Sequence, residues 1–228
     1  MPGCCLLAVE TATSACSAAL YINGEVRERY TLAPRQHAVL ILPMIESLLA
    51  EADLGVGRLD AIAFGRGPGS FTGVRIAASV TQGIAFAAEL PVVSVSTLAA
   101  LALGAMRASG EPRILAALDA RMAEIYLGAY VQDAGDLVRL LGEESVCRPE
   151  AVTLPDEADW TGAGSGWASY GPQLMAAVGQ RLHRFLPDLE PRAGDVARLG
   201  SARLGRGETL RPEQAVPVYL RNQVVRER

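Results

Sequence analysis

Lysine is absent from this chain, and histidine is scarce. All 21 basic residues are Arg, and His37 and His183 are the only histidines in 228 residues. The absence of Lys excludes a Walker-A phosphate loop, Schiff-base chemistry and a lysine general base. A helical metal site needs two histidines one turn apart on one face, and these two are far apart in the sequence. We therefore predict no catalytic residue and no metal ligand in this chain.

Aromatic residues and cysteines are also few. Phe, Trp and Tyr make up 5% of the chain although 50% of it is hydrophobic, so Ala, Leu and Val must fill the core, as in α/β proteins with closely packed helices and sheets. Cys4, Cys5, Cys16 and Cys147 form no CxxC pair and no spaced metal quartet. This pattern predicts reduced thiols rather than disulfides or a zinc site.

No uncharged segment is long and apolar enough to predict a membrane span. The longest, residues 90–106, contains Pro91 and Gly104 and fits a strand followed by a helix better. No basic segment precedes Glu10, so we expect no secretory signal, a cytoplasmic location and no membrane partner. The net charge of −4 makes the chain alone a poor surface for RNA phosphates, so contact with nucleic acid would need a partner.

A glycine-rich turn at residues 65–75 follows the apolar run 61–64 and precedes a helix. Its glycines permit close backbone approach, and Ser70 or Thr72 can cap the helix. Such a turn can bind a phosphate at the helix start, or it can simply pack the helix on a sheet. The surroundings of Ser70 do not match the GxSxG pattern of a hydrolase nucleophile.

The order of elements predicts an α/β fold. Asn23-Gly24 is a strong hairpin signal between two strands. In the first half, the patterns of hydrophobic residues indicate strands at 6–9, 16–22, 25–32, 60–65 and 92–95 and helices at 36–53 and 72–89.

The second half repeats this pattern more weakly. A strand at 114–118 ends in Asp119, as the first strand ends in Glu10, and strands follow at 124–131 and from residue 137. After them come one further strand, a glycine loop at 162–166 and helices near 172–185 and 193–204. We interpret this as a duplicated unit with an N-terminal lobe at 1–105, a reduced C-terminal lobe at 106–228, and a last helix that packs on the first lobe.

Two carboxylates at strand tips are expected to face the cleft between the lobes. Glu10 and Asp119 could hold Mg²⁺ through water, or each could cap its own turn. The candidates for nucleotide binding are Glu10, Thr11, Gly67, Gly69, Ser70 and Asp119. These residues also define an alternative function, a free-standing small-molecule kinase or ATPase.

Two helices have more apolar surface than one core requires. In the helix at 36–53 we expect an inward stripe of Ala38, Ile41, Leu42, Ile45, Leu48, Leu49 and Ala52. In the helix at 72–89 we expect Gly73, Ala77, Val80, Ile84 and Ala88 to face the sheet. The residues left over form a candidate partner interface: Val39, Leu40, Met44, Arg75, Ser79, Gln82 and Phe86. The alternative is ordinary surface, because singly exposed apolar residues are common.

An ordered set of motifs resembles the bacterial TsaB (YeaZ) family, within the actin and sugar-kinase superfamily. The motifs are Glu10-Thr11-Ala12-Thr13 with Cys16-Ser17, His37 through Leu42-Pro43-Met44-Ile45, and the segments at 67–75, 95–98, 118–121 and 217–221. The resemblance implies a duplicated actin-like (ribonuclease H-like) fold, with two lobes of mixed sheets flanked by helices. One position departs from it, because Glu10 stands where the family usually has Asp.

The resemblance also implies a function. Members are non-catalytic dimerisation or scaffold subunits of the complex that makes N6-threonylcarbamoyladenosine in tRNA, on the adenosine next to the anticodon. A catalytic paralogue, TsaD, transfers the threonylcarbamoyl group, and a small ATPase, TsaE, joins the pair. We therefore expect ATP or ADP and metal in the partner subunits rather than in this chain alone, and tRNA only through the complex. The chain alone could form a homodimer.

Overall fold

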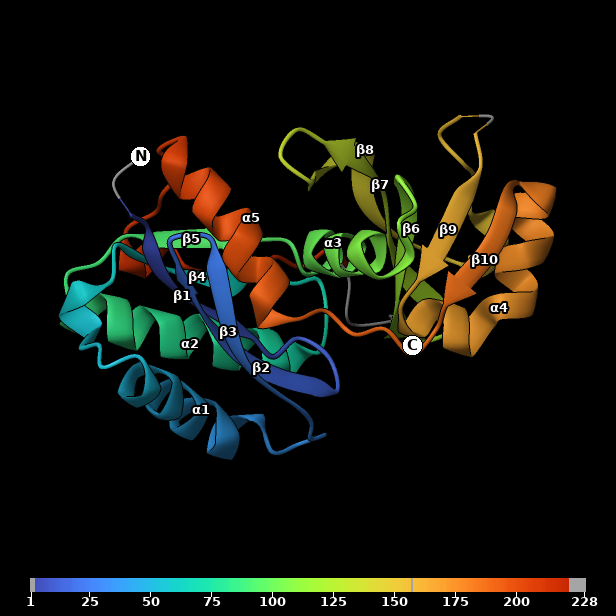
Figure 1. Ribbon diagram of the computed structural model, residues 1–228. Helices are drawn as coiled ribbons and strands as arrows, with labels where there is room; N and C mark the ends of the chain where they lie inside the picture. Colours follow the sequence, from blue (N-terminus) through green and yellow to red (C-terminus); the bar gives the residue numbers. More distant parts are fainter. Residues whose placement is uncertain (1–2, 157, 222–228) are drawn as a thin grey trace.

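A computed structural model describes residues 3–156 and 158–221. The chain forms two lobes side by side, each built on a five-stranded mixed sheet (Figure 1). This arrangement agrees with the fold class expected from the sequence.

The first sheet contains β1 (Cys5–Glu10), β2 (Ala15–Ile22), β3 (Glu25–Leu32), β4 (Ala61–Gly65) and β5 (Val92–Val95), in the order β3-β2-β1-β4-β5. β1, β2 and β3 form an antiparallel meander, while β4 and β5 are parallel to β1. Asn23 and Gly24 have φ angles of 53° and 100°, the left-handed values that a tight hairpin turn requires. The predicted strands of this lobe are confirmed.

The second sheet repeats the same topology. It contains β6 (Arg113–Arg121), β7 (Glu124–Asp133), β8 (Leu137–Cys147), β9 (Trp160–Ala163) and β10 (Leu182–Leu186), in the order β10-β9-β6-β7-β8. In both sheets the first strand is central, with an antiparallel pair on one side and a parallel pair on the other. The predicted helix near 172–185 was wrong in its second half, because the helix ends at Gly179 (φ 65°) and β10 follows.

Five α-helices cover the sheets in the described part of the chain. In the first lobe, α1 (His37–Glu51) and α2 (Phe71–Ala87) cover one face of the sheet, and α5 (Ala193–Gly205) packs on the other. In the second lobe, α3 (Thr97–Ser109) and α4 (Ser165–Val178) cover opposite faces. No helix of the described residues is long and apolar enough to cross a membrane.

The two lobes meet through α3 and α5, which contact each other between the sheets (Figure 1). The expected division after residue 105 falls inside α3, which packs on the second sheet. Short 3₁₀ turns complete the fold: η1 (Val56–Arg58), η2 (Pro149–Ala151), η3 (Gly179–Arg181) and η4 (Pro212–Gln214). The segment that follows η4 returns to the glycine turn, where the Val218 amide donates to the Arg66 carbonyl at 2.8 Å.

The faces that the helices bury differ in part from expectation. On α1 the buried side chains are His37, Ile41, Ile45, Leu48 and Leu49. Ala38 and Leu42, predicted to point inward, are exposed instead, and Leu42 is 47% exposed. On α2, Val80, Ile84 and Ala88 are only partly buried, while Ala78, Thr81 and Ala85 are buried. Because a helix turns about 100° per residue, a buried stripe whose centre lies one residue away from the predicted centre brings different side chains to the sheet.

Candidate functional site

A cleft of about 890 Å³ opens between the lobes, at the ends of the two central strands. Its walls come from the β1–β2 turn, the glycine turn with the start of α2, the β6–β7 turn and the start of α4. Residues on these walls include Ala12, Thr13, Gly69, Ser70, Thr72, Asp119, Arg121, Ser165 and Arg221. A volume of this size is in the range of small-molecule sites.

The glycine turn packs against the β1–β2 turn with almost no space between them. A Cβ atom at Gly69 would collide with the carbonyl oxygen of Ala12, and one at Gly73 would collide with that of Thr11. Ser70 is the N-cap of α2, and its Oγ accepts a hydrogen bond from the Gly73 amide at 3.4 Å. These contacts account for the glycines by packing alone, which is the structural interpretation left open by the sequence.

Glu10 is buried beneath this turn instead of facing the cleft. Its carboxylate accepts hydrogen bonds from the Ala12 amide at 2.7 Å and from the Thr97 hydroxyl at 3.0 Å. A Cβ atom at Gly65 would collide with the same carboxylate. Burial, opposed only in part by these hydrogen bonds, raises the pKa of Glu10 to about 7. The expectation that Glu10 faces the cleft was therefore wrong.

Asp119 does line the cleft, and it caps the β6–β7 turn. Its Oδ1 accepts a hydrogen bond from the Arg121 amide at 2.8 Å, and its Oδ2 pairs with the Arg121 guanidinium at 3.1 Å. These contacts correspond to the turn-capping interpretation. Because Glu10 is enclosed below the glycine turn, the structure does not join the two carboxylates into one open site.

The other nucleotide-binding candidates divide in the same way. Gly69 and Ser70 lie on the wall of the cleft. Thr11 and Gly67 are buried behind it; the Thr11 hydroxyl donates to the Gly73 carbonyl at 2.7 Å, and the Gly67 amide donates to the Thr97 hydroxyl at 3.2 Å. Among the described residues no group of three or more His, Cys, Asp or Glu side chains could hold a metal ion.

The two histidines take part in structural contacts in different lobes. His37 is buried at the start of α1, where its Nε2 lies 3.1 Å from the Ala15 carbonyl. His183 lies on β10, and its Nε2 is 3.0 Å from the Asp159 carboxylate. Both Nε2 atoms are engaged with protein acceptors, and His37 lines the cleft whereas His183 does not.

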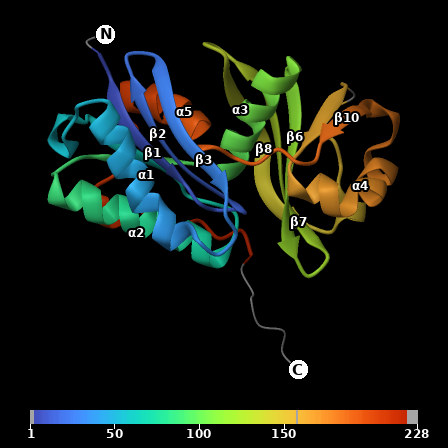
Figure 2. The same cartoon turned by 60° about the horizontal axis from the view of Figure 1, so that its bottom comes forward.

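The outer face of α1 and α2 carries exposed apolar side chains. The two helices lie side by side on the first sheet in both ribbon views (Figures 1 and 2). Val39 is 73% exposed and Phe86 is 77% exposed, and Ser79 is exposed as well. A groove of about 330 Å³ between the helices is lined by Ala38, Phe71, Thr72, Arg75, Ile76, Ser79 and Val80.

The remaining interface candidates are less free. Leu40 and Met44 are partly buried and pack on the core of the first lobe. The Gln82 side chain donates to the Ala215 carbonyl at 3.0 Å, and the Arg75 guanidinium donates to the Phe71 carbonyl at 3.0 Å. Sequence reasoning missed Leu42 and Phe71, which are exposed on the same face. Leu42 follows Val39 by three residues, and this helical spacing was the signal that could have found it.

Comparison with known proteins identifies the family. The model described as "TsaD: tRNA N6-adenosine threonylcarbamoyltransferase" matches residues 30–224. The tRNA threonylcarbamoyladenosine biosynthesis protein TsaB of Escherichia coli (strain K12) is 41% identical over 222 residues, which cover 96% of this chain and 95% of that protein. This chain belongs to the TsaB family. The TsaB of Haemophilus influenzae is 39% identical over 230 residues, covering 96% of this chain and 94% of that protein.

A solved structure supports the same conclusion. The structure described as "YeaZ from Pseudomonas aeruginosa" is 47% identical to this chain and has a TM-score of 0.89. The match covers 95% of this chain and 100% of the YeaZ chain. The two-lobed actin-like fold expected from the motifs is thereby confirmed. TsaB membership also confirms the expected role in tRNA threonylcarbamoyladenosine biosynthesis, rather than that of a free-standing kinase or ATPase.

Proposed function

We propose that this chain is the non-catalytic scaffold subunit of a tRNA N6-threonylcarbamoyladenosine transferase complex. In this role the outer face of α1 and α2 binds a TsaD-type catalytic paralogue, which modifies the adenosine next to the anticodon. The observation that carries the proposal is the exposure of Val39 and Phe86, at 73% and 77%, on neighbouring helices of one lobe. Large exposed apolar side chains beside a shallow apolar groove are typical of association surfaces.

The interior of the chain supports the non-catalytic part of the proposal. The acid expected at the cleft, Glu10, is enclosed and bonded to Ala12 and Thr97. Two acids line the cleft: Asp119 is engaged by Arg121, and Glu190 accepts a hydrogen bond from the Ser14 hydroxyl. A catalytic carboxylate must be free to contact the substrate or to exchange a proton with it, and the contacts of these carboxylates are better suited to holding the lobes in shape.

We assign the chemistry to the partners. The ATP or ADP and the metal that take part in the reaction belong to the TsaD-type paralogue and to a TsaE-type ATPase that joins the pair, and tRNA is bound only through the assembled complex in the cytoplasm. The net charge of −4 supports this division, because RNA phosphates require a basic surface. When the paralogue is absent, a second copy of this chain can cover the same apolar face.

Reconstitution tests the role in the complex. The purified chain, incubated with tRNA and threonylcarbamoyl-adenylate, should form no modified nucleoside. Addition of the paralogue and the ATPase should restore the product, as measured by mass spectrometry of digested tRNA. Robust transfer by this chain alone, in a preparation free of host enzyme, would overturn the scaffold assignment.

A matched pair of variants tests the surface. Phe86→Glu should weaken binding to the paralogue by about 2 kcal/mol or more, the range for an interface anchor. Met175→Glu is the control, because Met175 is 49% exposed on α4 of the other lobe. Equal affinity of both variants for the paralogue would show that α2 is ordinary surface.

A further inference from the structure

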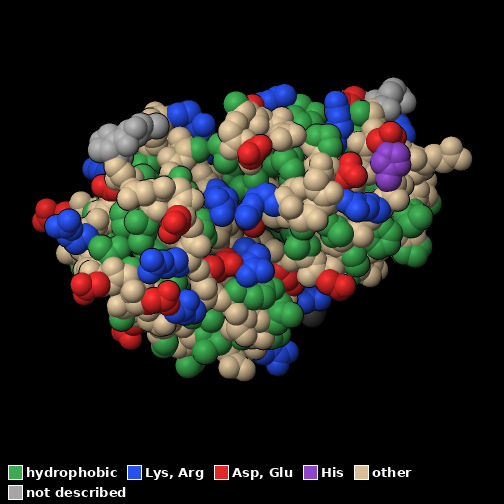
Figure 3. Space-filling view, viewed as in Figure 1, with side chains coloured by type: hydrophobic (Ala, Val, Ile, Leu, Met, Phe, Trp, Pro, Cys, Tyr) green, Lys and Arg blue, Asp and Glu red, His purple; other side chains and the backbone are tan. Residues whose placement is uncertain are grey.

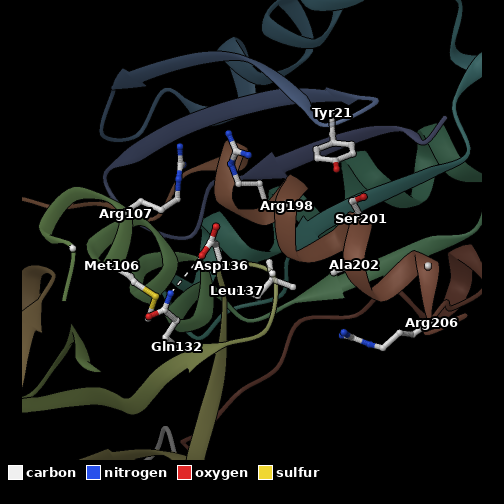
Figure 4. Close-up of a pocket in the computed structure, with 13 residues that line it drawn as sticks. Tyr21, Met106, Arg107, Gln132, Asp136, Leu137, Arg198, Ser201, Ala202 and Arg206 are labelled. Atoms are coloured by element: carbon white, nitrogen blue, oxygen red, sulfur yellow. Dashed lines mark hydrogen bonds between the residues drawn. The ribbon is translucent and has the colours of Figure 1, made fainter. Parts of the chain in front are cut away.

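A second groove lies between the lobes, separate from the cleft at the glycine turn. It has a volume of about 840 Å³ and is formed by the end of α3, the outer side of α5 and the β7–β8 turn (Figure 4). Its lining includes Tyr21, Met106, Arg107, Gln132, Asp136, Leu137, Arg198, Ser201 and Arg206. None of these residues lines the first cleft.

Three arginines line this groove: Arg107 on α3, Arg198 on α5 and Arg206 at the C-terminal cap of α5. Arg107 pairs with the buried carboxylate of Asp195 at 2.9 Å, and the Arg206 Nε pairs with Glu208 at 2.6 Å. Arg198 is different, because its Nε is removed from solvent and has no hydrogen-bond partner among the described residues. Figure 3 shows arginine side chains, with carboxylates among them, along the middle of the face where α3 and α5 meet.

A smaller cavity of about 130 Å³ adjoins the groove and shares Leu137, Ala202 and Arg206 with it. Arg66 and Arg203 line this inner cavity. The Arg66 Nε is also buried without a partner in the described part of the chain. The Arg203 guanidinium donates to the Ser94 carbonyl at 2.8 Å, and burial, together with the nearby Arg66, lowers the pKa of Arg203.

The acids around the two cavities leave the Nε atoms of Arg66 and Arg198 without a hydrogen bond, although Asp195 interacts electrostatically with Arg198. In the inner cavity, Glu144 accepts hydrogen bonds from the hydroxyls of Ser96 and Tyr130. In the outer groove, Asp136 accepts from the Gln132 amide at 3.4 Å. Two guanidinium Nε atoms of residues that line these cavities are thus buried without an acceptor, and a buried donor that lacks an acceptor is costly.

We propose that the groove and its inner cavity bind a small phosphorylated molecule of up to nucleotide size. Arg198 and Arg206 contact phosphate oxygens in the groove, and Arg66 does so in the inner cavity. Guanidinium groups match phosphate oxygens in geometry and charge, and the volume of the groove is in the range of small-molecule sites. Tyr21, Met106 and Leu137 offer apolar surface to the rest of the ligand.

A discrete small ligand fits better than an RNA strand. The chain has a net charge of −4, and several arginines on this face already pair with carboxylates, as Arg107 does with Asp195. RNA backbone binding relies on an extended basic surface. Here only two donors in the described residues of the two cavities lack a partner, the Nε atoms of Arg66 and Arg198, and both are buried. This site is independent of the proposed scaffold function, since it lies on α3, α5 and the β7–β8 turn rather than on α1 and α2.

Calorimetric titration of the full chain tests the proposal, with ADP and inorganic pyrophosphate as the small probes and an RNA stem-loop as the macromolecular one. We expect ADP or pyrophosphate to bind with a Kd below about 1 mM. Arg198→Gln should weaken this binding about tenfold or more, because it removes a charge-assisted contact. Arg58→Gln is the control for charge, since Arg58 is exposed on η1 in the first lobe.

A second variant separates this site from the cleft at the glycine turn. Arg121→Gln changes the cleft and should leave binding of the small probes unchanged. Arg66→Gln should weaken binding as Arg198→Gln does, with thermal melting used to check that it folds. The proposal is overturned if neither small probe binds at probe concentrations well above about 1 mM, or if only the RNA binds. It is also overturned if Arg121→Gln, rather than Arg198→Gln, abolishes binding of the small probes.

Discussion

The carboxylate of Glu10 and the hydroxyl of Thr97 are joined by a hydrogen bond of 3.0 Å. Glu10 ends the central strand of the first sheet, and Thr97 begins α3, the helix that packs on the second sheet. The same Thr97 hydroxyl accepts from the Gly67 amide at 3.2 Å. One buried acid thus fixes a strand end, the glycine turn and the start of the helix that leads to the second lobe.

Burial of Glu10 makes stability depend on pH. Below pH 4.5, its ordinary pKa, the folded and unfolded states both hold the proton, and the stability associated with the neutral acid is fully present. As pH rises from 4.5 to about 7, the unfolded state loses the proton first, so the free energy of unfolding falls, by at most about 3 kcal/mol. Glu10→Gln should remove this decline. Urea unfolding of both proteins at several values between about pH 5 and pH 8 measures the difference.

The matched control for this prediction is Glu143→Gln, at an exposed position on β8. It should keep the wild-type decline in stability. Glu10→Gln could instead lose stability at every pH while its free energy of unfolding keeps the wild-type slope against pH. That result would mean that the Glu10 carboxylate is ionised in the folded state and that its desolvation does not cause the decline.

The packing of α2 on the β1–β2 turn predicts opposite effects for two glycines of one helix. A Cβ at Gly73 would collide with the Thr11 carbonyl oxygen, whereas a Cβ at Gly83 would have no atom within 4 Å apart from its chain neighbours and the nearby backbone of its own helix. Gly73→Ala should therefore lower the free energy of unfolding by about 1–3 kcal/mol through overpacking. Gly83→Ala should raise it by about 0.5–1 kcal/mol, because Ala favours a helix over Gly.

Chemical denaturation of both variants measures this difference. Equal changes in stability for the two variants would mean that α2 is free to shift away from the turn. Gly73→Ala should also weaken binding to the paralogue in proportion to any displacement of α2, while Gly83→Ala tests whether the open side of the helix is needed by the partner.

The face of α1 separates interface residues from core residues. Val39 is 73% exposed, while Leu40 is partly buried and packs on the first-lobe core. Val39→Asp should therefore weaken binding to the paralogue and leave the Tm of the free chain nearly unchanged. Leu40→Asp should lower the Tm as well, because it places a charge against buried apolar side chains. A fall in Tm for Val39→Asp would place that side chain in the core instead.

Local signals in the sequence predicted most of the fold. Asn23-Gly24 predicted the β2–β3 hairpin because its backbone angles are rare in other residues, and the apolar run 61–64 preceded a correctly placed helix. β10 escaped prediction because it contains His183 and Arg184 and lies at a sheet edge, so its pattern lacks a continuous apolar run. The helix that we predicted across this segment ends instead at Gly179, whose positive φ is visible only in the structure.

The site was less predictable because it depends on directions of side chains. The strand tip of Glu10 was placed correctly, but whether the carboxylate points outward or beneath the turn depends on Gly65 and Thr97, which lie far away in the sequence. The unsatisfied Nε of Arg198 is likewise invisible in the sequence, because 21 basic residues offer many equivalent candidates. Only the packing of α5 between the lobes distinguishes it.

Asp119 provides the last prediction, since it is the one strand-tip acid that remains open to the cleft. It accepts a hydrogen bond from the Arg121 amide at 2.8 Å and pairs with the Arg121 guanidinium at 3.1 Å. If it acts as a turn cap, Asp119→Asn should keep the amide hydrogen bond and change stability by less than about 1 kcal/mol, because the ion pair involves an exposed arginine. Asp119→Ala should lower stability by about 1 kcal/mol, because the Arg121 amide loses its acceptor. Neither variant should change ATP hydrolysis by the isolated chain, which we expect to equal that of buffer in a phosphate-release assay. Measurable turnover in the wild-type chain, lost in Asp119→Asn at unchanged stability, would assign a catalytic role to the cleft and contradict the scaffold proposal.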